Sequence, residues 1–388
     1  MHVDIPSVLA GFACLATAVS GSALPPASSA EKLLTSLQKQ AVAALKERGA
    51  GANGCTVENA AVRRDWAKLS KKERKEYIRA VQCLRSAPAK GDPSFAPGAK
   101  TRFDDFVAVH INNTLSIHGT GNFLTWHRYV TWAYENALRE ECGYKGTQPY
   151  WNWFHRADDM TKSPVFDGSD TSLGGNGEFK AHNGTLGGAG AIFIPPGVGG
   201  GCVTKGPFVD FPANIGPVRP GMDGMVPSPT GPLGPNPRCL TRDLSNVVSR
   251  TYFTHANLHN LTLGAASGSI ELMQNEFQGR FADGFLGMHG AGHFGVGGDA
   301  SDLFSSITDP SFYMHHSMVD FVYWIWQALH PDLAGDIAGS ITVNNSPPSR
   351  EARKDDLLPM GVTTQDRPIG DLLDTLGGTP GCYIFEYW

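Results

Sequence analysis

Histidine is the residue type in this sequence with the clearest capacity for chemistry. His110, His118 and His127 lie within eighteen positions of one another. At about 100° per helical residue, His110 shares a face with Phe103 and the apolar residues that follow, so it points inward. His118 and His127 would point in opposite directions on one helix, but the glycine-containing break at 119–121 lets His118 approach from a loop. Three inward imidazoles are a donor set suited to copper or zinc.

A second pair, His289 and His293, has the i, i+4 spacing that places two imidazoles on one helical face. The residue after His289 is Gly290 rather than the glutamate of a His-Glu-x-x-His zinc protease, so no general base accompanies the pair. Gly290 and Gly292 add little bulk beside the imidazoles. We therefore expect both glycines to line the mouth of a substrate pocket.

The third group follows an Asp-Pro dipeptide at 309–310 and begins an apolar helix. It contains the adjacent residues His315 and His316. Phe312, His316 and Asp320 are spaced at i, i+4 and i+8 and share one helical face. We expect Asp320 to accept a hydrogen bond from a ligand imidazole and so to select its tautomer. We expect Phe312 to pack against the site and to contribute to the substrate pocket.

The other histidines are weaker candidates. His255 and His259 also have i, i+4 spacing, but the sequon at Asn260 indicates exposure and no third histidine lies near them. Three further histidines belong to no group and are expected to be structural or at the surface: His155, His182 and His330.

Helices must position these side chains. Helical patterning extends over 31–48, 56–86, 122–141 and 311–330, and returns around 241–282. Residues 168–238 are instead rich in Gly, Pro, Asn and Ser, which predicts a surface loop system packed over the body. No internal repeat is visible. The sequence therefore predicts one mainly α-helical domain with long loops and a few short strands.

Composition narrows the possible functions. The 32 basic and 37 acidic residues give a net charge of −5, and no positive surplus favours a nucleic-acid partner. With 41% hydrophobic and 18% charged residues, the chain is neither a coiled coil nor a disordered tail. Beyond the N-terminus, no apolar run is long enough for a membrane span.

Residues 1–23 have the features of a secretory signal peptide. Their apolar run, 5–19, is shorter than the roughly 20 residues that cross a bilayer. Residues 24–388 would then form a single secreted, extracellular domain. Four sequons fit an exported glycoprotein: Asn112, Asn183, Asn260 and Asn344.

Removal of Cys14 with the signal leaves six cysteines, which permit three disulfides in fifteen connectivities. Cys202 and Cys239 both lie in the loop region and would staple it. For the others we hypothesise that Cys83 pairs with Cys142 beside the first histidine group. Cys55 and Cys382 would then tie the two ends of the chain together.

With these groups in place, the sequence resembles the tyrosinase, catechol oxidase and haemocyanin group of dicopper proteins. The resemblance is greatest to the short secreted fungal polyphenol oxidases. It covers roughly residues 102–330 and rests on four stretches: Asn122 to Tyr129, Pro149 to Trp153, His289 to His293, and Asp309 to Asp320.

The resemblance implies two copper ions in a central four-helix bundle. Copper A would be held by His110, His118 and His127, and copper B by His289, His293 and His316. His315 would lie behind the ligands, and no other catalytic residue is implied. Leu303 is a candidate gate over the bound ring. Phe385-Glu386-Tyr387 is similar to the aromatic-x-Tyr motif that ends the catalytic core, so we expect no C-terminal lid domain.

This sequence departs from the family pattern at three points. Ser116 stands where many fungal relatives have a cysteine bonded to the second ligand. Gly290 stands where efficient monophenol hydroxylases often have asparagine. Relatives also have a water-ordering glutamate upstream of that position, for which Glu271 and Glu276 are the candidates.

These observations predict a monomeric copper-dependent catechol oxidase. It would oxidise small o-diphenols to o-quinones while dioxygen is reduced to water, with weak action on monophenols. The alternative is a true tyrosinase that hydroxylates monophenols efficiently. A haemocyanin-type oxygen carrier and a dizinc hydrolase are remote alternatives, the second because zinc hydrolases usually include carboxylate ligands.

Overall fold

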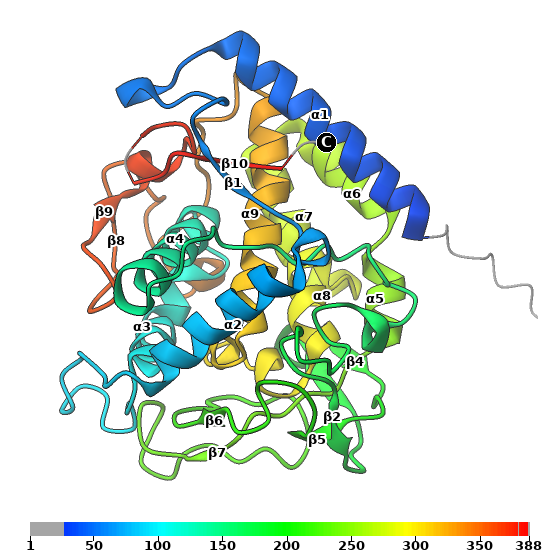
Figure 1. Ribbon diagram of the computed structural model, residues 1–388. Coiled ribbons are helices and arrows are strands. Elements are labelled where there is room, and N and C mark those ends of the chain that lie inside the picture. Colours follow the sequence, from blue (N-terminus) through cyan, green and yellow to red (C-terminus); the bar gives the residue numbers. More distant parts are fainter. Residues whose placement is uncertain (1–26, 379, 387–388) are drawn as a thin grey trace, which may run out of the picture.

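The computed structural model describes residues 27–378 and 380–386, so the predicted signal peptide and Cys14 lie outside the described residues. Helices dominate the chain (Figure 1). They are α1 (Ala27–Arg48), α2 (Lys71–Ser86), α3 (Arg102–Ile117), α4 (Phe123–Cys142), α5 (Asn246–Tyr252), α6 (His255–Thr262), α7 (Ile270–Gln278), α8 (Gly287–Val296) and α9 (Ser311–Leu329). The predicted mainly α-helical class is confirmed.

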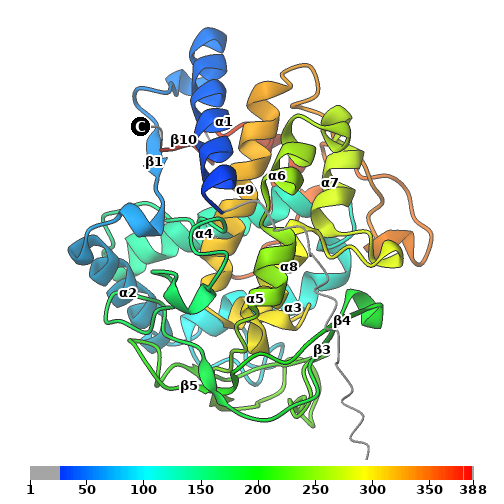
Figure 2. The same cartoon turned by 90° about the vertical axis from the view of Figure 1, so that its right-hand side faces the viewer.

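Helix α9 runs through the middle of the molecule, as both views show (Figures 1 and 2). Its residues are buried from Ser311 to Ala328, and a helix that is apolar all round must be covered on every side. Helices α4 and α8 pack against it, and α3 packs against α4. Helices α1 and α6 also contact α9. Helices α3, α4, α8 and α9, which carry or border all three histidine groups, form the core.

Local signals place the ends of the core helices. Thr101 caps α3 in a reciprocal arrangement with Asp104, in which each side chain accepts the other's backbone N–H. Helix α4 ends at Gly143, whose φ of 68° is the left-handed conformation that glycine adopts readily. Pro310 precedes α9 with φ of −61°, a value compatible with a helix start.

The prediction of one helix over 56–86 is wrong in its first half. Only 71–86 is α-helical, and it begins at a capping box of Ser70 and Glu73. Trp66–Lys68 forms one short 3-10 turn before it. Upstream, β1 (Ala61–Arg63) pairs in parallel with β10 (Tyr383–Phe385), some 320 positions later in the chain. A strand partner this remote outweighs local helical patterning, and no window of neighbouring residues reveals it.

Residues 168–238 form the predicted loop system at one end of the helical body (Figure 2). Three antiparallel pairs of short strands shape it: β2 (Gly177–Phe179) with β5 (Gly200–Val203), β3 (Thr185–Gly187) with β4 (Ile192–Ile194), and β6 (Pro212–Ala213) with β7 (Arg238–Cys239). A fourth pair lies near the C-terminus, β8 (Leu357–Leu358) with β9 (Arg367–Pro368). The Cys202–Cys239 disulfide closes the loop system.

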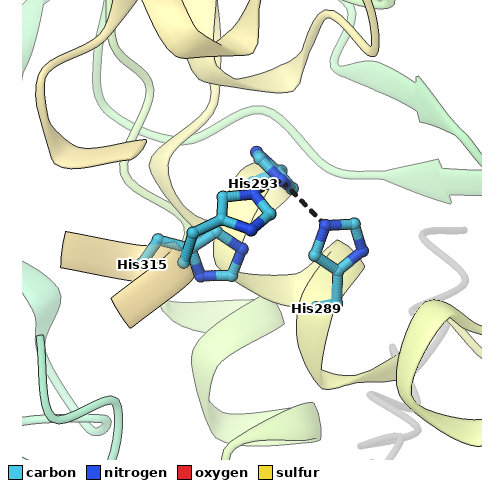
Figure 3. A group of neighbouring side chains, drawn as sticks. His289, His293 and His315 are labelled. Atoms are coloured by element: carbon cyan, nitrogen blue, oxygen red, sulfur yellow. Dashed lines mark hydrogen bonds between the residues drawn. The ribbon is translucent and has the colours of Figure 1, made fainter. Parts of the chain in front are cut away.

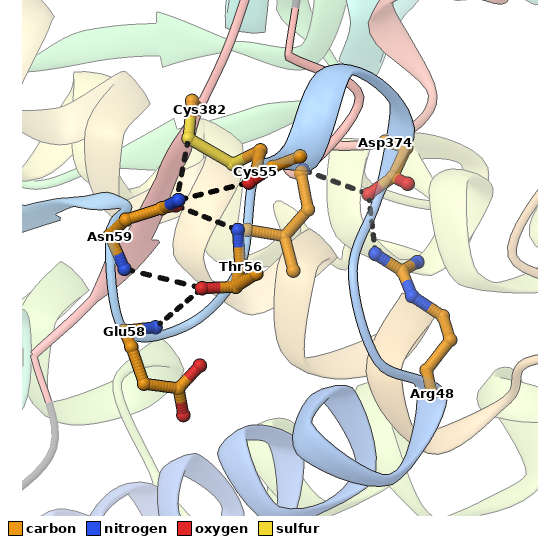
Figure 4. Close-up of a disulfide and its surroundings, with 9 residues drawn as sticks. Arg48, Cys55, Thr56, Glu58, Asn59, Asp374 and Cys382 are labelled. Atoms are coloured by element: carbon orange, nitrogen blue, oxygen red, sulfur yellow. Dashed lines mark hydrogen bonds and ion pairs between the residues drawn. A yellow bond between two sulfur atoms is a disulfide. The ribbon is translucent and has the colours of Figure 1, made fainter.

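The two ends of the chain are joined by the Cys55–Cys382 disulfide, across 327 positions (Figure 4). Nearby, Arg48 at the end of α1 pairs with Asp374 at 3.0 Å. The third disulfide, Cys83–Cys142, joins α2 to the end of α4. All three predicted pairings are confirmed.

Three of the four sequon asparagines are exposed: Asn112, Asn183 and Asn344. Asn260 is partly buried, and its amide donates to Glu276. Their glycosylation remains a prediction. Among the described helices, none is both long and apolar enough to cross a bilayer.

Candidate metal centre

The side chains of His110, His118 and His127 lie close together, although they come from two helices and the turn between them. His110 lies on α3 and His127 on α4. His118 follows α3 directly in extended conformation, with φ of −125° and ψ of 139°, as the predicted break requires. Gly119 then turns the chain with φ of 58°, a value that few residues other than glycine adopt. The three rings are 4.9 to 5.9 Å apart between centroids.

The second group comes from α8 and α9. His289 and His293 stand one turn apart on α8, and His315 extends from the first turns of α9 (Figure 3). His316 follows it on α9. Nε2 of His293 lies 3.1 Å from Nε2 of His289 and 3.3 Å from Nε2 of His316. The Nε2 atoms of His289, His293 and His316 therefore lie close enough together to bind one metal ion.

The two groups face each other across the core. The ring of His127 stacks on the ring of His316 with centroids 4.4 Å apart and planes at 14°. Within each group, the nearest ring nitrogens lie within 4.8 Å of one another. The arrangement offers two adjacent nitrogen-lined positions.

Backbone carbonyls orient four of the rings. Nδ1 of His110 lies 2.7 Å from the oxygen of Phe304, and Nδ1 of His127 lies 2.8 Å from the oxygen of Phe123. Two further rings are held in the same way, His118 by Thr114 and His293 by Ala300. A carbonyl can only accept, so Nδ1 carries the proton and Nε2 keeps a free lone pair for a metal.

Burial keeps these imidazoles neutral, which is the form that binds metal. Burial lowers the pKa of His118 to about 4 and that of His293 to about 3. The pKa of His110, His127 and His316 is well below the usual range, first because of burial and then because of the neighbouring rings. The pKa of His289 is lowered in the same way.

The donor set fits copper. Nε2 of His110 and Nε2 of His127 are buried and have no hydrogen-bond partner, which is costly unless a ligand satisfies them. Both groups consist entirely of histidines within the described residues, with no carboxylate among the donors. An all-imidazole set suits copper better than a hard oxygen-seeking cation.

Asp320 does not perform the role predicted for it. Its carboxylate accepts from Arg63 at 3.0 Å, from Arg128 at 2.6 Å and from the hydroxyl of Tyr383 at 2.5 Å, not from an imidazole. Asp320 stands about one helical turn beyond His316 on α9, and at that level it meets a different set of neighbours. Because Arg128 follows His127, Asp320 instead fastens α4 to α9 beside that histidine.

Gly292 also lies elsewhere than predicted. A Cβ atom at this position would stand 2.0 Å from Cε1 of His315, so Gly292 provides close approach between α8 and α9 and does not line the pocket. The ring of His315 stacks on that of His289 with centroids 5.5 Å apart and lies 5.3 Å from Trp153. Neither ring nitrogen of His315 has a hydrogen-bond partner.

A cavity of about 170 Å³ opens beside three of the histidines, His118, His289 and His293. Gly290 and Leu303 line it, and Leu303 is 45% exposed. Phe312 does not line the cavity. It lies behind the imidazoles, with its ring 4.2 Å from that of His316 and 5.3 Å from that of His110.

Gln278 is one of several pocket residues that the sequence did not predict. Its Oε1 accepts from the N–H of Gly119 at 2.8 Å, which steadies the turn after His118. Of the glutamates proposed to order a water, Glu276 pairs with Arg280, and neither it nor Glu271 lines the cavity. Gln278 stands in that region, but nothing in the residue type or spacing marks it.

The remaining histidines take no part in the centre. His255 and His259 lie on α6 with ring centroids 6.2 Å apart, and within the described residues no third donor completes a metal group with them. Nδ1 of His155 contacts Glu31, and Nδ1 of His330 contacts the oxygen of Trp326. His182 lies beside Asp243.

Comparison with known proteins identifies the family. Residues 100–329 match the family model described as the common central domain of tyrosinase. The chain is 41% identical over 338 residues to the tyrosinase-like protein orsC of Emericella nidulans, covering 84% of this chain and 88% of that protein. It is 39% identical over 333 residues to tyrosinase P of Aspergillus terreus, covering 84% and 91%.

Its fold is similar to that of a substituted variant of the polyphenol oxidase from Thermothelomyces thermophila. The TM-score is 0.86 and the identity 38%, over 94% of this chain and 100% of that chain. This agreement extends well beyond the segment that carries the histidines. The chain therefore belongs to the tyrosinase family of copper oxidoreductases.

Proposed function

We propose that this protein is a secreted o-diphenol oxidase that converts catechols to o-quinones and acts weakly on monophenols. Copper A is assigned to His110, His118 and His127, and copper B to His289, His293 and His316. The observation that carries the proposal is the convergence of six neutral imidazoles beside an open pocket. Five of them come from α3, α4, α8 and α9, and the sixth, His118, comes from the turn after α3. A pair of copper ions so held supplies two-electron exchange between a catechol and dioxygen.

The protein's own contribution is to hold the donors and to shape the access route. The carbonyls of Phe304, Phe123 and Ala300 fix ring orientation before any metal or substrate arrives. Phe281 and Phe294 line the cavity with apolar surface that suits an aromatic ring and displaces water. A catechol entering past Leu303 would meet His289 and His293 directly.

Weak monophenol hydroxylation follows from the absence of a polar side chain at Gly290. The hydroxyl of a monophenol must lose its proton before its oxygen can bind copper. Glycine at position 290 has no side chain that could orient a base for this step. A larger residue at this position requires a small shift of Leu286, since its Cβ would lie 3.1 Å from Cγ of that side chain. We therefore expect Gly290→Asn to hydroxylate tyramine faster than the parent enzyme.

Paired initial rates of oxygen uptake test the proposal on copper-loaded protein. We expect fast turnover of 4-tert-butylcatechol and slow, lagging turnover of 4-tert-butylphenol. Comparable rates on the two substrates would identify a true tyrosinase and contradict the argument from Gly290. A Gly290→Asn variant that hydroxylates tyramine no faster than the parent would also contradict that argument. If the protein binds oxygen but oxidises neither substrate, it is an oxygen carrier. If mass spectrometry finds zinc in place of copper in the protein, it is a hydrolase.

Secretion is proposed on the apolar run at 5–19 and on the three disulfides, which form in oxidising compartments. We further propose that the mature protein is a monomer consisting of one domain. N-terminal sequencing of the protein from culture medium and light scattering test these two statements. An intact residue 1 or a dimer mass would contradict them.

A further inference from the structure

We propose that Arg219 binds the anionic substituent of a phenolic acid and so makes the enzyme prefer catechols that carry a carboxylate. This inference rests on the proposed function and names the substrate class of the same pocket. It starts from a positive charge near the pocket wall that no acidic side chain of the described residues compensates.

The wall of the pocket holds the backbone of Arg219 in place. Asp302 lines the cavity, and its carboxylate accepts the backbone N–H groups of Val218 and Arg219. The same carboxylate accepts the N–H groups of Phe304 and Ser305. Segment 218–219, from the long loop system, is thereby fastened to the segment that carries Leu303.

The guanidinium of Arg219 has no anionic partner. It lies over the ring of Phe304, with Cζ 5.5 Å from the centroid, and the residue is exposed. Across 27–378 and 380–386, no carboxylate oxygen within 4.0 Å pairs with it, and its side chain donates no hydrogen bond. Asp302 binds the backbone of Arg219, but its oxygens are occupied by the backbone N–H groups just named. Asp223, four positions after Arg219, accepts instead from the amide of Asn183 at 3.0 Å.

The other arginine beside the pocket shows a contrasting arrangement. Arg280 lies between the pocket residues Gly279 and Phe281, and its guanidinium pairs with Glu276 and Asp283. Its charge is therefore compensated within the protein. Of these two cations near the pocket, Arg219 alone is left for a ligand.

Arg219 does not line the cavity, but its backbone N–H is bound by Asp302, which does, so we place its side chain at the outer end of a bound catechol. The carbonyl of Phe304 holds Nδ1 of His110, so one side of this residue faces the metal centre while its ring lies under Arg219. A catechol places its two hydroxyls toward the histidines, and its para substituent then points outward past the exposed Leu303. A carboxylate on that substituent comes within the reach of a long, flexible arginine side chain.

The test compares three catechols that differ in the charge of the para substituent. They are 3,4-dihydroxyphenylacetate, 4-methylcatechol and dopamine, which are anionic, neutral and cationic. In the parent enzyme we expect KM to rise in that order. We expect Arg219→Gln to raise KM for the anion about three- to fivefold, the size of one exposed charge pair, with little change for the neutral catechol.

Two variants and a salt series sharpen the result. Arg219→Lys keeps the charge and should restore most of the preference, whereas Arg79→Gln removes an exposed charge from α2, away from the pocket, and should change nothing. The preference should shrink as sodium chloride rises from about 0.02 to 0.5 M, because screening shortens the range of the interaction.

Equal KM changes for all three catechols in Arg219→Gln would overturn the proposal, because packing on Phe304 would then explain the effect. An unchanged KM for the anion would also overturn it. If none of the three catechols is oxidised by the copper-loaded parent, the proposed function fails instead, so the two failures are distinguishable.

Discussion

Each histidine of the centre has a distinct reason for facing the metal position. His110 and His127 are directed by their own helices, whereas His118 depends on the extended backbone at the end of α3. Residue 116 is serine and not cysteine, so it forms no thioether with His118. The hydroxyl of Ser116 donates instead to the carbonyl of Asn113. The Thr114 carbonyl and the Gln278–Gly119 hydrogen bond supply the restraint on that turn.

Removal of one ligand should remove one copper. In His293→Ala, only two of the three assigned imidazoles of copper B remain, so we expect copper content to fall from about two ions to about one per chain. Mass spectrometry of metal content measures this. His259→Ala, which removes an exposed histidine of α6, should keep both ions. Two ions retained in His293→Ala would contradict the assignment.

At the scale of elements, the centre depends on how closely α8 approaches α9. The glycines of α8 have different tasks that the sequence does not distinguish. Gly292 permits contact with the ring of His315, while Gly290 lies at the pocket beside Leu286. A helix that must both carry two ligands and lie tightly on its neighbour tolerates little added volume on the contact side.

A pair of alanine substitutions tests this difference. Gly292→Ala would bring Cβ to 2.0 Å from the His315 ring, so we expect a loss of about 1–3 kcal/mol in unfolding free energy and weakened copper retention. Gly290→Ala should cost less, since its nearest contact is 3.1 Å from a leucine side chain. Urea unfolding of both variants gives the comparison, and similar losses would contradict it.

At the scale of the whole molecule, a buried charge network joins both ends of the chain to the core. Asp320 of α9 binds Arg63 of β1 and Arg128 of α4, and Arg63 also binds Glu135. Tyr383 of β10 adds its hydroxyl to Asp320. Each member is satisfied by the others, so the removal of one leaves an uncompensated buried charge.

We expect Asp320→Ala to lower the free energy of unfolding by about 3–5 kcal/mol, because Arg128 loses its carboxylate partner in the interior. Asp371→Ala provides the matched control, since its pair with Arg367 is partly exposed and should contribute less than about 1 kcal/mol. Denaturant titrations of the two variants measure the difference. A small effect at Asp320 would mean that the network adds no stability.

The depressed histidine pKa values make the stability of the copper-free protein depend on pH. In the unfolded chain these histidines titrate near 6.5, whereas in the folded protein His118 and His293 do so near 4 and 3. Between these limits the unfolded chain binds more protons, so stability is fully present above about pH 6.5 and is lost as pH falls.

Thermal unfolding of the copper-free protein should therefore show Tm nearly constant from pH 8 to 7 and falling steeply from pH 6 to 4. Substitution of His118 by Gln removes one of the titrating groups and should make the decline shallower. A Tm that rises on acidification, or a slope unchanged in the variant, would show that other groups control acid stability.

Much of this protein was accessible from residue types and spacing. The histidine groups, the break that frees His118, helices 31–48, 122–141 and 311–330, and the three disulfide pairings all agree with the structure. These features depend on helical periodicity, on the positions of the cysteines along the chain and on motifs that resemble a known family. Periodicity involves only neighbouring residues, and the family motifs are short segments that can be recognised in the sequence.

Other features required the tertiary structure. The strand at 61–63, the partners of Asp320, the contact of Gly292 with His315 and the position of Gln278 all involve residues far apart in the chain. Periodicity places a side chain on a helical face, but it does not show which residues of other elements pack against that side chain. The uncompensated charge of Arg219 has the same origin, because only the folded chain shows which acids come near it and which do not.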